Sequence, residues 1–384
     1  TPTRRQRQMC IRDSIITENE VFLGNIHFRD GLINDVSKGL SSIPRSIDCN
    51  NDYLIPGLIE LHTDNLERHL KPRPGVKWPI TNALIAHDAE LASVGITTVF
   101  DALRVGSINN DGVQRYDKYA RETATSINNL SKDNSFKINH FIHLRAEICS
   151  ENLTEEFAEF NLQDNVKIIS LMDHTPGQRQ FRDLSQFKIY LSGKFGLSEN
   201  QIEKHFSYLK KLQKKYGKKH KDETIKFSKY LNAVLASHDD TTKSDVEESK
   251  SLGIKLAEFP TTLKAAKESH CNNMKIIMGA PNLVRGGSHS GNVSAQSLID
   301  EDLLDILSSD YVPSSLIIAA IMWGVKSGNL PKSISAVTKN PAIASGLNDR
   351  GIIEQGLRAD LVRLSIKNDI PIIRKVWANG KEIA

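Results

Sequence analysis

The sequence predicts an α/β fold: a (β/α)8 TIM-type barrel with a small β-rich domain built from both chain ends. Two observations lead to this prediction. Short apolar runs alternate with amphipathic stretches through the middle of the chain, and both ends show the alternation and turn residues of short strands. A doubly wound parallel sheet is the rival fold, but no Gly-x-Gly-x-x-Gly motif follows an early strand.

Eight apolar runs supply the barrel strands, and each is bounded by polar or turn residues as a buried parallel strand should be. They span residues 54–61, 97–102, 141–147, 166–172, 233–237, 255–259, 276–279 and 304–308. The stretches between them have helical spacing and supply the outer helices. We therefore expect the barrel to occupy residues 54–344.

The two chain ends predict a second, smaller domain. Residues 15–51 alternate around an Asp30-Gly31 turn, and the last residues of the chain contain an Asn379-Gly380 turn. We expect one sheet domain from residues 15–53 and 345–384. Residues 1–14 have several arginines and no apolar segment, and we expect them to be a non-native or disordered leader outside the fold.

Composition excludes several classes of protein. No apolar stretch is long enough for a transmembrane helix, and four cysteines without a Cys-x-x-Cys pair indicate a reduced, cytoplasmic protein. The net charge is +4, and many lysines lie in residues 203–230. These lysines are best interpreted as the solvated face of a helix. The alternative is that their charge attracts an anionic substrate towards the active site. We expect no nucleic-acid partner, because the densest lysine run, "KKLQKKYGKKHK", has a single tyrosine and no alternation of aromatic and basic residues.

Polar residues gather where the predicted strands end. A buried parallel strand is apolar, and charged residues are tolerated at its carboxyl end because barrel active sites lie there. His62 and Asp64 point to the same face of the first strand because side chains alternate along a strand. Further strands end in Asp101, in Arg145 and Glu147, in Asp173 and His174, in His238, Asp239 and Asp240, in Glu258, and in Asp310.

Six of these residues predict a centre for two divalent metal ions: His62, Asp64, Glu147, His174, His238 and Asp310. Glu147 can bridge two ions, bound water would be acidified, and Asp310 can take its proton. Mixed histidine and carboxylate ligands suit zinc, manganese or iron. Singly, each histidine could be structural, and each carboxylate could cap a helix. Asp173, Asp239 and Asp240 are left out of the set for that reason.

Longer motifs resemble a known family. "IPGLIELHTDN" near the start and "TKNPAIASGLNDRGIIEQGLRADLV" near the end resemble the amidohydrolase superfamily. "HTDNLERHLKPRPGVKWP", "SLMDHTPGQRQF" and "MGAPNLVRGGSHSGN" resemble its family of alpha-D-ribose 1-methylphosphonate 5-triphosphate diphosphatases, from the carbon–phosphorus lyase pathway. The resemblance implies a barrel with a flanking β-sandwich, a binuclear metal centre and pyrophosphate release from a ribose triphosphate.

The resemblance also sharpens the expected ligand set. Much of the superfamily has a histidine where Asp64 stands and a lysine where Glu147 stands, whereas the narrower family is expected to have these two carboxylates. The strand count places His174 and His238 one strand earlier than is usual in the superfamily. Either one strand is miscounted or one metal contact differs.

A triphosphate substrate requires fixed donors and cations in the pocket. Glycine lets backbone N–H groups approach phosphate, and arginine pairs with it. Each candidate has an alternative role as a turn, a surface residue or a buried ion-pair partner. The predicted substrate-binding residues are Arg145, Gln178, Arg179, Arg285, Gly286, Gly287 and Ser288, and His289 is a candidate for protonating or binding the leaving group.

The predicted partner is therefore a small phosphorylated molecule, without nucleic acid or membrane; a homo-oligomer is left open. A cyclic amidase or deaminase on the same scaffold is the alternative function, since the fold alone does not exclude it. An amidase would not need an Arg/Gly loop opposite the metals. A non-catalytic protein of this fold would be expected to have lost some of its metal ligands. All six predicted positions hold metal-capable residues, which argues against that class.

Overall fold

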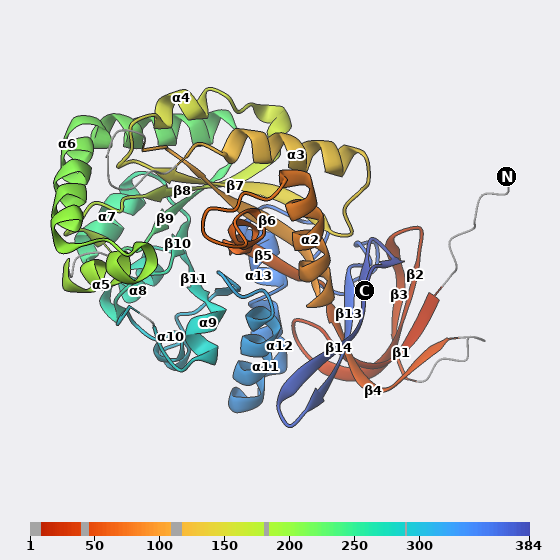
Figure 1. Cartoon of the computed structure of the whole chain (residues 1–384). Helices are drawn as coiled ribbons and strands as arrows, with labels where there is room; N and C mark the ends of the chain where they lie inside the picture. Colours follow the sequence, from red (N-terminus) through yellow and green to blue (C-terminus); the bar gives the residue numbers. More distant parts are fainter. Residues whose placement is uncertain (1–8, 40–45, 109–116, 180–183, 289) are drawn as a thin grey trace. The chain divides into compact units, whose positions relative to one another are not determined.

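The computed structural model describes the chain except residues 1–8, 40–45, 109–116, 180–183 and 289. Within the described part, two sheets organise the fold (Figure 1). The chain divides into two compact units. The first unit comprises Thr1–Val99, Leu130–His140 and Ile306–Ala384, and the second comprises Phe100–Asn129 and Phe141–Asp305. The predicted domain boundaries at residues 53–54 and 344–345 stay a prediction.

The barrel prediction is confirmed. Strands β5 to β12 form one eight-stranded sheet in chain order, and a parallel bridge between Thr63 and Asp310 joins its first strand to the residues after its last. The paired strands β7 to β11 are parallel. Their bounds are β5 Leu58–Thr63, β6 Ile96–Val105, β7 Asn139–Glu147, β8 Val166–Met172, β9 Val234–His238, β10 Leu256–Glu258, β11 Lys275–Gly279 and β12 Ile306–Ser308. The strand count is thus correct: His174 lies just beyond the fourth strand, and His238 ends the fifth.

The start of the first barrel strand was predicted four residues too early, at Leu54 instead of Leu58. Leu54 belongs to β4 (Ile47–Pro56) of the smaller sheet, and β5 begins only at Leu58. Gly57 separates them and lies close to Thr97, because a Cβ atom at Gly57 would come within 2.2 Å of the Thr97 hydroxyl. A continuous apolar run therefore serves two sheets, and only the proline and the glycine mark the change.

Strands from both chain ends form the second sheet, a sandwich-like domain within the first unit. Its strand order is β15-β14-β13-β4-β1-β2-β3. Phe28 packs edge-on against the buried Trp377, which is consistent with a core shared by both chain ends. The remaining bounds are β1 Met9–Ile16, β2 Val21–Arg29, β3 Leu32–Lys38, β13 Leu361–Lys367, β14 Ile370–Ala378 and β15 Lys381–Glu382.

Two details of this sheet bear on the sequence predictions. The predicted turns are confirmed, since Asp30-Gly31 and Asn379-Gly380 both have positive φ at each residue, as a tight hairpin turn requires. Residues 9–14 of the predicted leader lie in β1, which starts at Met9 and pairs with β2 along its length; that the leader is non-native stays a prediction. Residues 1–8 lie outside the described part of the chain.

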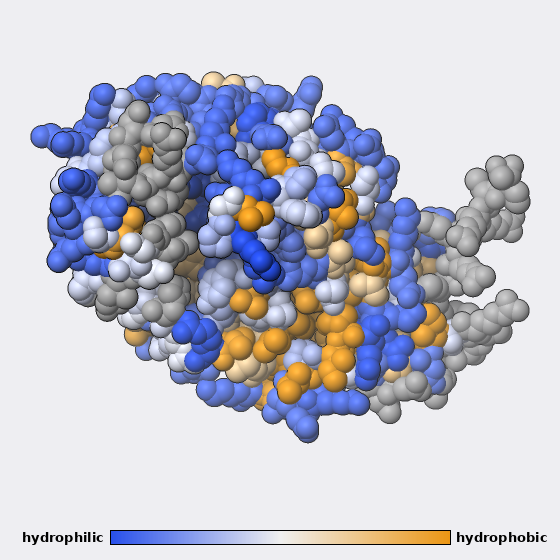
Figure 2. Space-filling view, in the orientation of Figure 1, coloured by the Kyte–Doolittle hydropathy of each residue, from blue (hydrophilic) through white to orange (hydrophobic). Residues whose placement is uncertain are grey.

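Most helices follow one barrel strand and precede the next along the chain (Figure 1). The longest is α6 (Glu199–Tyr230), which begins with a capping box between Ser198 and Gln201. Its lysines at positions 211, 215 and 218 are exposed, and Figure 2 shows mainly hydrophilic residues over this part of the surface. This supports the solvated-face interpretation. The others are α1 Asn65–Leu70, α2 Ile80–Ser93, α3 Ala120–Lys132, α4 Leu153–Phe157, η1 Leu162–Asp164, α5 Leu184–Phe195, α7 Lys243–Ser251, α8 Leu263–Cys271, α9 Ala280–Val284, α10 Ala295–Asp300, α11 Ser315–Ser327, α12 Leu330–Ser335 and α13 Lys339–Ala344.

None of the described helices is both long enough and apolar enough to cross a membrane.

Candidate metal centre

The first unit brings three of the six predicted ligands to adjoining strand ends. His62 is buried near the end of β5, and Asp64 follows that strand and precedes α1. Asp310 lies just beyond β12, where its carbonyl oxygen accepts from the Asp64 N–H at 3.0 Å and from the Thr63 hydroxyl at 2.7 Å. The backbone of Asp310 has a positive φ of 53°, a conformation that aspartate tolerates better than most residues. Backbone contacts therefore hold His62, Asp64 and Asp310 in one region.

Sequence reasoning missed Glu60, a wholly buried carboxylate on the same strand. It accepts from the His62 N–H at 2.7 Å, from the Ser308 hydroxyl at 2.7 Å and from the Ser309 N–H. Burial raises its pKa, although hydrogen bonds from Ser309, His62 and Ser308 oppose that rise. Glu60 thus links β5 to the last barrel strand. The available signal was a glutamate inside an apolar run, two residues before His62.

The second unit brings the other three predicted ligands together. Glu147 ends β7 and is buried, and its carboxylate is hydrogen-bonded to His174 Nδ1 and accepts from the His174 N–H at 3.3 Å. Burial acts to raise the pKa of Glu147, but the charge and hydrogen bond of His174 outweigh it and lower the pKa. The rings of His174 and His238 lie edge to face, with centroids 6.0 Å apart.

A further carboxylate completes a cation-sized cluster in this unit. Donor atoms of His174, His238 and Asp239 all lie within 4.8 Å of one another, and His238 Nε2 is 3.3 Å from an Asp239 oxygen. Two imidazoles and a carboxylate are ligands that suit zinc, manganese or iron. The residues present therefore fit a divalent metal ion. Asp239 had been set aside as a helix-capping residue, and its burial beside two histidines is the signal that the sequence did not show.

Arg179 is already engaged by the protein. Its buried guanidinium donates to the His238 carbonyl at 2.9 Å and to Asp240. Burial acts to lower its pKa, and the nearby Asp240 and two further aspartates raise it overall. Arg179 thus holds the loop after β8 against the end of β9. Its predicted contact with phosphate stays a prediction, and this ion pair offers it a structural role instead.

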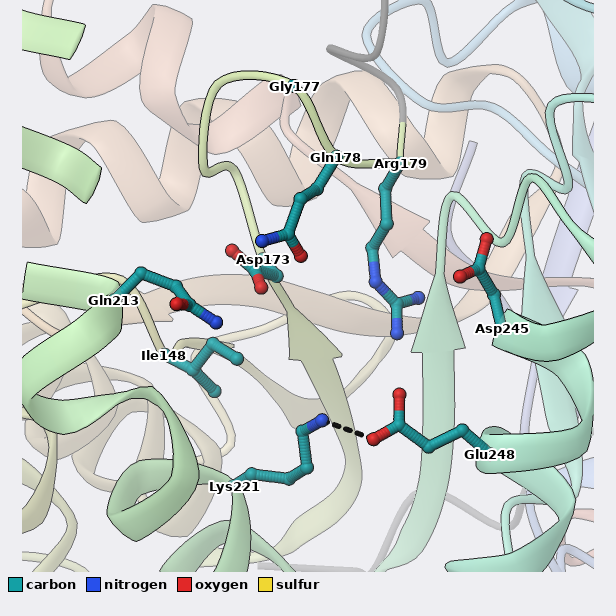
Figure 3. Close-up of a pocket in the computed structure, with 9 residues that line it drawn as sticks. All are labelled: Ile148, Asp173, Gly177, Gln178, Arg179, Gln213, Lys221, Asp245 and Glu248. Carbon is teal, nitrogen blue, oxygen red and sulfur yellow. Dashed lines mark hydrogen bonds and ion pairs between the residues drawn. The ribbon is translucent and has the colours of Figure 1, made fainter.

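A cavity of about 150 Å³ lies beside Arg179 (Figure 3). Gln178 and Lys221 also line it, and Lys221 is paired with Glu248. Three carboxylates and two cations line the cavity, so its charge does not favour a phosphate group. The lining residues are Ile148, Asp173, Gly177, Gln178, Arg179, Gln213, Lys221, Asp245 and Glu248.

The predicted glycine loop differs from expectation at its start. It was expected to follow a strand at Asn282, but residues up to Val284 form the short helix α9, and Arg285 is its exposed C-cap. Gly286 and Gly287 continue as a turn in which the Gly287 N–H donates to the Asn282 carbonyl at 2.8 Å. Ser288 follows and is half-buried, as is Arg145 on β7. His289 lies outside the described residues, so its predicted role stays a prediction.

Solved structures with the same fold are hydrolases and related enzymes. One is a crystal structure of an amidohydrolase, with a TM-score of 0.61 and 14% identity, covering 98% of each chain. Another is a 5-methylcytosine deaminase from Klebsiella pneumoniae, with a TM-score of 0.63 and 12% identity, again covering 98% of each chain. An N-acetyl-D-glucosamine-6-phosphate deacetylase from Mycobacterium smegmatis has a TM-score of 0.60 and 13% identity, covering 98% of this chain and 100% of that one. These likenesses define the fold.

The chain therefore has the barrel fold of these enzymes. No family model matches the sequence. A curated protein from Escherichia coli (strain K12), alpha-D-ribose 1-methylphosphonate 5-triphosphate diphosphatase, is 40% identical over 372 residues, covering 96% of this chain and 98% of that protein. At this identity and coverage, the chain belongs to the alpha-D-ribose 1-methylphosphonate 5-triphosphate diphosphatase family, as the resemblance predicted.

Proposed function

We propose that this chain hydrolyses alpha-D-ribose 1-methylphosphonate 5-triphosphate to the 5-phosphate and pyrophosphate. The observation that carries the proposal is the 40% identity to the Escherichia coli diphosphatase over nearly the whole of both chains. The metal-capable residues at the strand ends support it, because a hydrolase of a charged phosphoanhydride needs positive charge beside the phosphates. Cys49, Cys149 and Cys271 are free thiols, which supports a cytoplasmic location.

We propose two divalent ions as cofactors. The proposed ligands are His62, Asp64 and Asp310 in the first unit and Glu147, His174 and His238 in the second, all at or just beyond the carboxyl ends of barrel strands. Asp239 is a further candidate, from its place in the His174 and His238 cluster. The ions would acidify water and offset the negative charge of the phosphates. Zinc, manganese and iron all fit these ligands.

The residues of the chain suggest how the reaction proceeds. Water attacks the α phosphorus in line with the bond to the β phosphate, and its proton passes to the Asp310 carboxylate. The new bond joins the water oxygen to the α phosphorus. The bond from the α phosphorus to the bridging oxygen breaks, and pyrophosphate leaves with the electron pair. Arg145, Arg285 and the Gly286–Gly287 turn are the proposed contacts for the remaining phosphate oxygens.

The test is the identity of the released product. The purified chain, loaded in turn with Zn²⁺, Mn²⁺ or Fe²⁺, is incubated with the ribose 5-triphosphate, and pyrophosphate and orthophosphate are measured separately. Pyrophosphate in equal amount to the 5-phosphate supports the proposal. Stepwise release of orthophosphate, or no release with any of the three metals, overturns it. A cyclic amide substrate run in parallel tests the alternative amidase function.

A further inference from the structure

Four buried polar side chains lie on four neighbouring strands of the second unit. They are His143 on β7, Ser170 on β8, His238 on β9 and Glu258 on β10, and each is at most 7% exposed. Glu258 is the direct partner of His238 in the parallel pairing of β9 and β10. Such a row is unusual in the interior of parallel strands, which is normally apolar. The cost of burying these groups indicates a specific purpose for them.

Hydrogen bonds and close contacts link these four side chains into one continuous network. The Ser170 hydroxyl donates to Glu258 Oε2 at 2.6 Å, and His238 Nδ1 lies 3.3 Å from that same oxygen. His143 Nε2 is hydrogen-bonded to the Ser170 hydroxyl and lies 3.7 Å from Glu258 Oε1. Glu258 is therefore in contact with both histidines and with the serine between their strands.

The hydrogen bonds among these four side chains have only one consistent donor-to-acceptor direction. A carboxylate accepts hydrogen bonds and a hydroxyl has a single proton to donate. Because the Ser170 proton points to Glu258, His143 must donate its Nε2 proton to the Ser170 oxygen. His238 carries its proton on Nδ1, because Nδ1 makes the hydrogen bond to Glu258, whereas Asp239 Oδ2, 3.3 Å from Nε2, has no hydrogen-bond partner in the described part of the chain. The lone pair of neutral His238 is then on Nε2, which is the nitrogen that lies 3.3 Å from Asp239 in the candidate cation cluster.

We propose that Glu258 is a positioning residue for the metal centre: it fixes His238 as the Nδ1–H tautomer and so presents Nε2 to the metal ion. A histidine ligand is commonly oriented in this way by a carboxylate on its other nitrogen. Ser170 and His143 hold Glu258 in place in turn. The inference rests on the proposed metal centre, and it assigns to Glu258 a function outside the six predicted ligands.

Two substitutions separate this role from direct metal ligation. Glu258→Met removes the acceptor, whereas Glu258→Gln keeps a side-chain oxygen that can accept from Ser170 and His238. Glu156→Met is the matched control, since Glu156 is also a buried glutamate of the second unit and accepts from two backbone N–H groups rather than from a histidine. Each full-length variant is compared with wild type after metal removal.

The first readout is the protonation of the His238 ring, measured without metal by nitrogen-15 NMR of histidine-labelled protein and assigned with His238→Gln. We expect the Nδ1–H tautomer in wild type, in Glu258→Gln and in Glu156→Met, and its loss in Glu258→Met. An Nε2–H tautomer in wild type overturns the proposal. This readout needs neither metal nor substrate, so it is independent of the proposed reaction.

The second readout is the affinity for Mn²⁺ alone, measured by isothermal titration calorimetry. We expect Glu258→Met to bind about 10- to 100-fold more weakly than wild type, with Glu258→Gln restoring most of the loss and Glu156→Met unchanged. Wild-type affinity in Glu258→Met overturns the proposal. An equal loss in Glu258→Gln, with one fewer ion per chain, also overturns it and makes Glu258 a direct ligand. Failure of wild type to release pyrophosphate, with both readouts as expected, would refute the proposed function but not the role of Glu258.

Discussion

Glu90 on α2 holds the short helix that follows the His62-Thr63-Asp64 segment. Its carboxylate accepts from Asn65 Nδ2 at 2.9 Å and from Arg68 at 2.6 Å, and it is paired with His69 Nε2 at 2.8 Å. Burial acts to raise the pKa of Glu90, but the bonds to Asn65, Arg68 and His69 outweigh it and lower the pKa from 4.5 to about 2. We predict that this carboxylate gives the protein a stability that depends on pH.

The expected size of the effect follows from the pKa difference. A fall of the Glu90 pKa from 4.5 to about 2 corresponds to about 3 kcal/mol of stabilisation of the folded state, before any screening by solvent. The Glu90 side chain is 30% exposed and that of Arg68 is 60% exposed, so solvent screens part of it. We therefore expect the Glu90 carboxylate to add about 1–2 kcal/mol to the free energy of unfolding at pH 7. Because the folded pKa lies below the unfolded one, this contribution is present above pH 4.5 and is lost as the pH falls towards 2.

The measurement is urea unfolding of metal-free wild type and Glu90→Gln between pH 7 and pH 3. The free energy of unfolding of the variant should be lower by about 1–2 kcal/mol at pH 7, and the difference should shrink below pH 4.5. Glu354→Gln serves as control, because Glu354 is exposed in the same unit and its side chain makes no hydrogen bond within the described part of the chain. A difference that stays constant from pH 7 to pH 3 would refute the argument from charge.

Three further predictions concern single residues. Asp310→Asn should lower turnover by about 10²- to 10⁴-fold in the pyrophosphate assay; circular dichroism should show an unchanged fold, because the contacts with β5 use the Asp310 backbone oxygen. Arg121→Met should reduce the free energy of unfolding by about 2 kcal/mol in urea, because it removes two hydrogen bonds of 2.8 Å to the buried Asp164 carboxylate. Maleimide at pH 7 should label the exposed Cys271 but not Cys149, whose thiol pKa is raised by burial; peptide mass mapping would show it, and rapid labelling of Cys149 would contradict it.

The barrel could be predicted from the sequence because its strands are buried on both faces. Such strands are continuous apolar runs, and all eight were located to within a few residues. The error at Leu54 has the same cause, since apolar character does not show which sheet a residue joins. The helix α9 was missed because Pro281 and the glycines after it resemble loop residues, although proline is well tolerated in the first turn of a helix.

The metal-capable residues were predictable, but the groups that hold them were not. A histidine or carboxylate at the tip of an apolar run is visible in one sequence. The partner of that residue depends on the register between strands far apart in the chain, as in the pairing of Glu258 with His238. Asp239 and Arg179 show the same limit: the sequence does not show that Asp239 lies in a cation-sized cluster with His174 and His238, or that Arg179 is paired with Asp240.

Each compact unit contains a wholly buried glutamate that contacts a metal-capable histidine. Glu60 accepts from the backbone N–H of His62, and Glu258 lies against the ring of His238. Buried carboxylates rarely add stability, because removing charge from water costs more than its contacts return. Their retention beneath a ligand set is expected if the histidines must be held rigidly before the metal arrives, since a preformed site loses less entropy on binding. Removing either carboxylate should therefore weaken Mn²⁺ binding in isothermal titration calorimetry, beyond the loss of stability that its broken hydrogen bonds cause in urea unfolding.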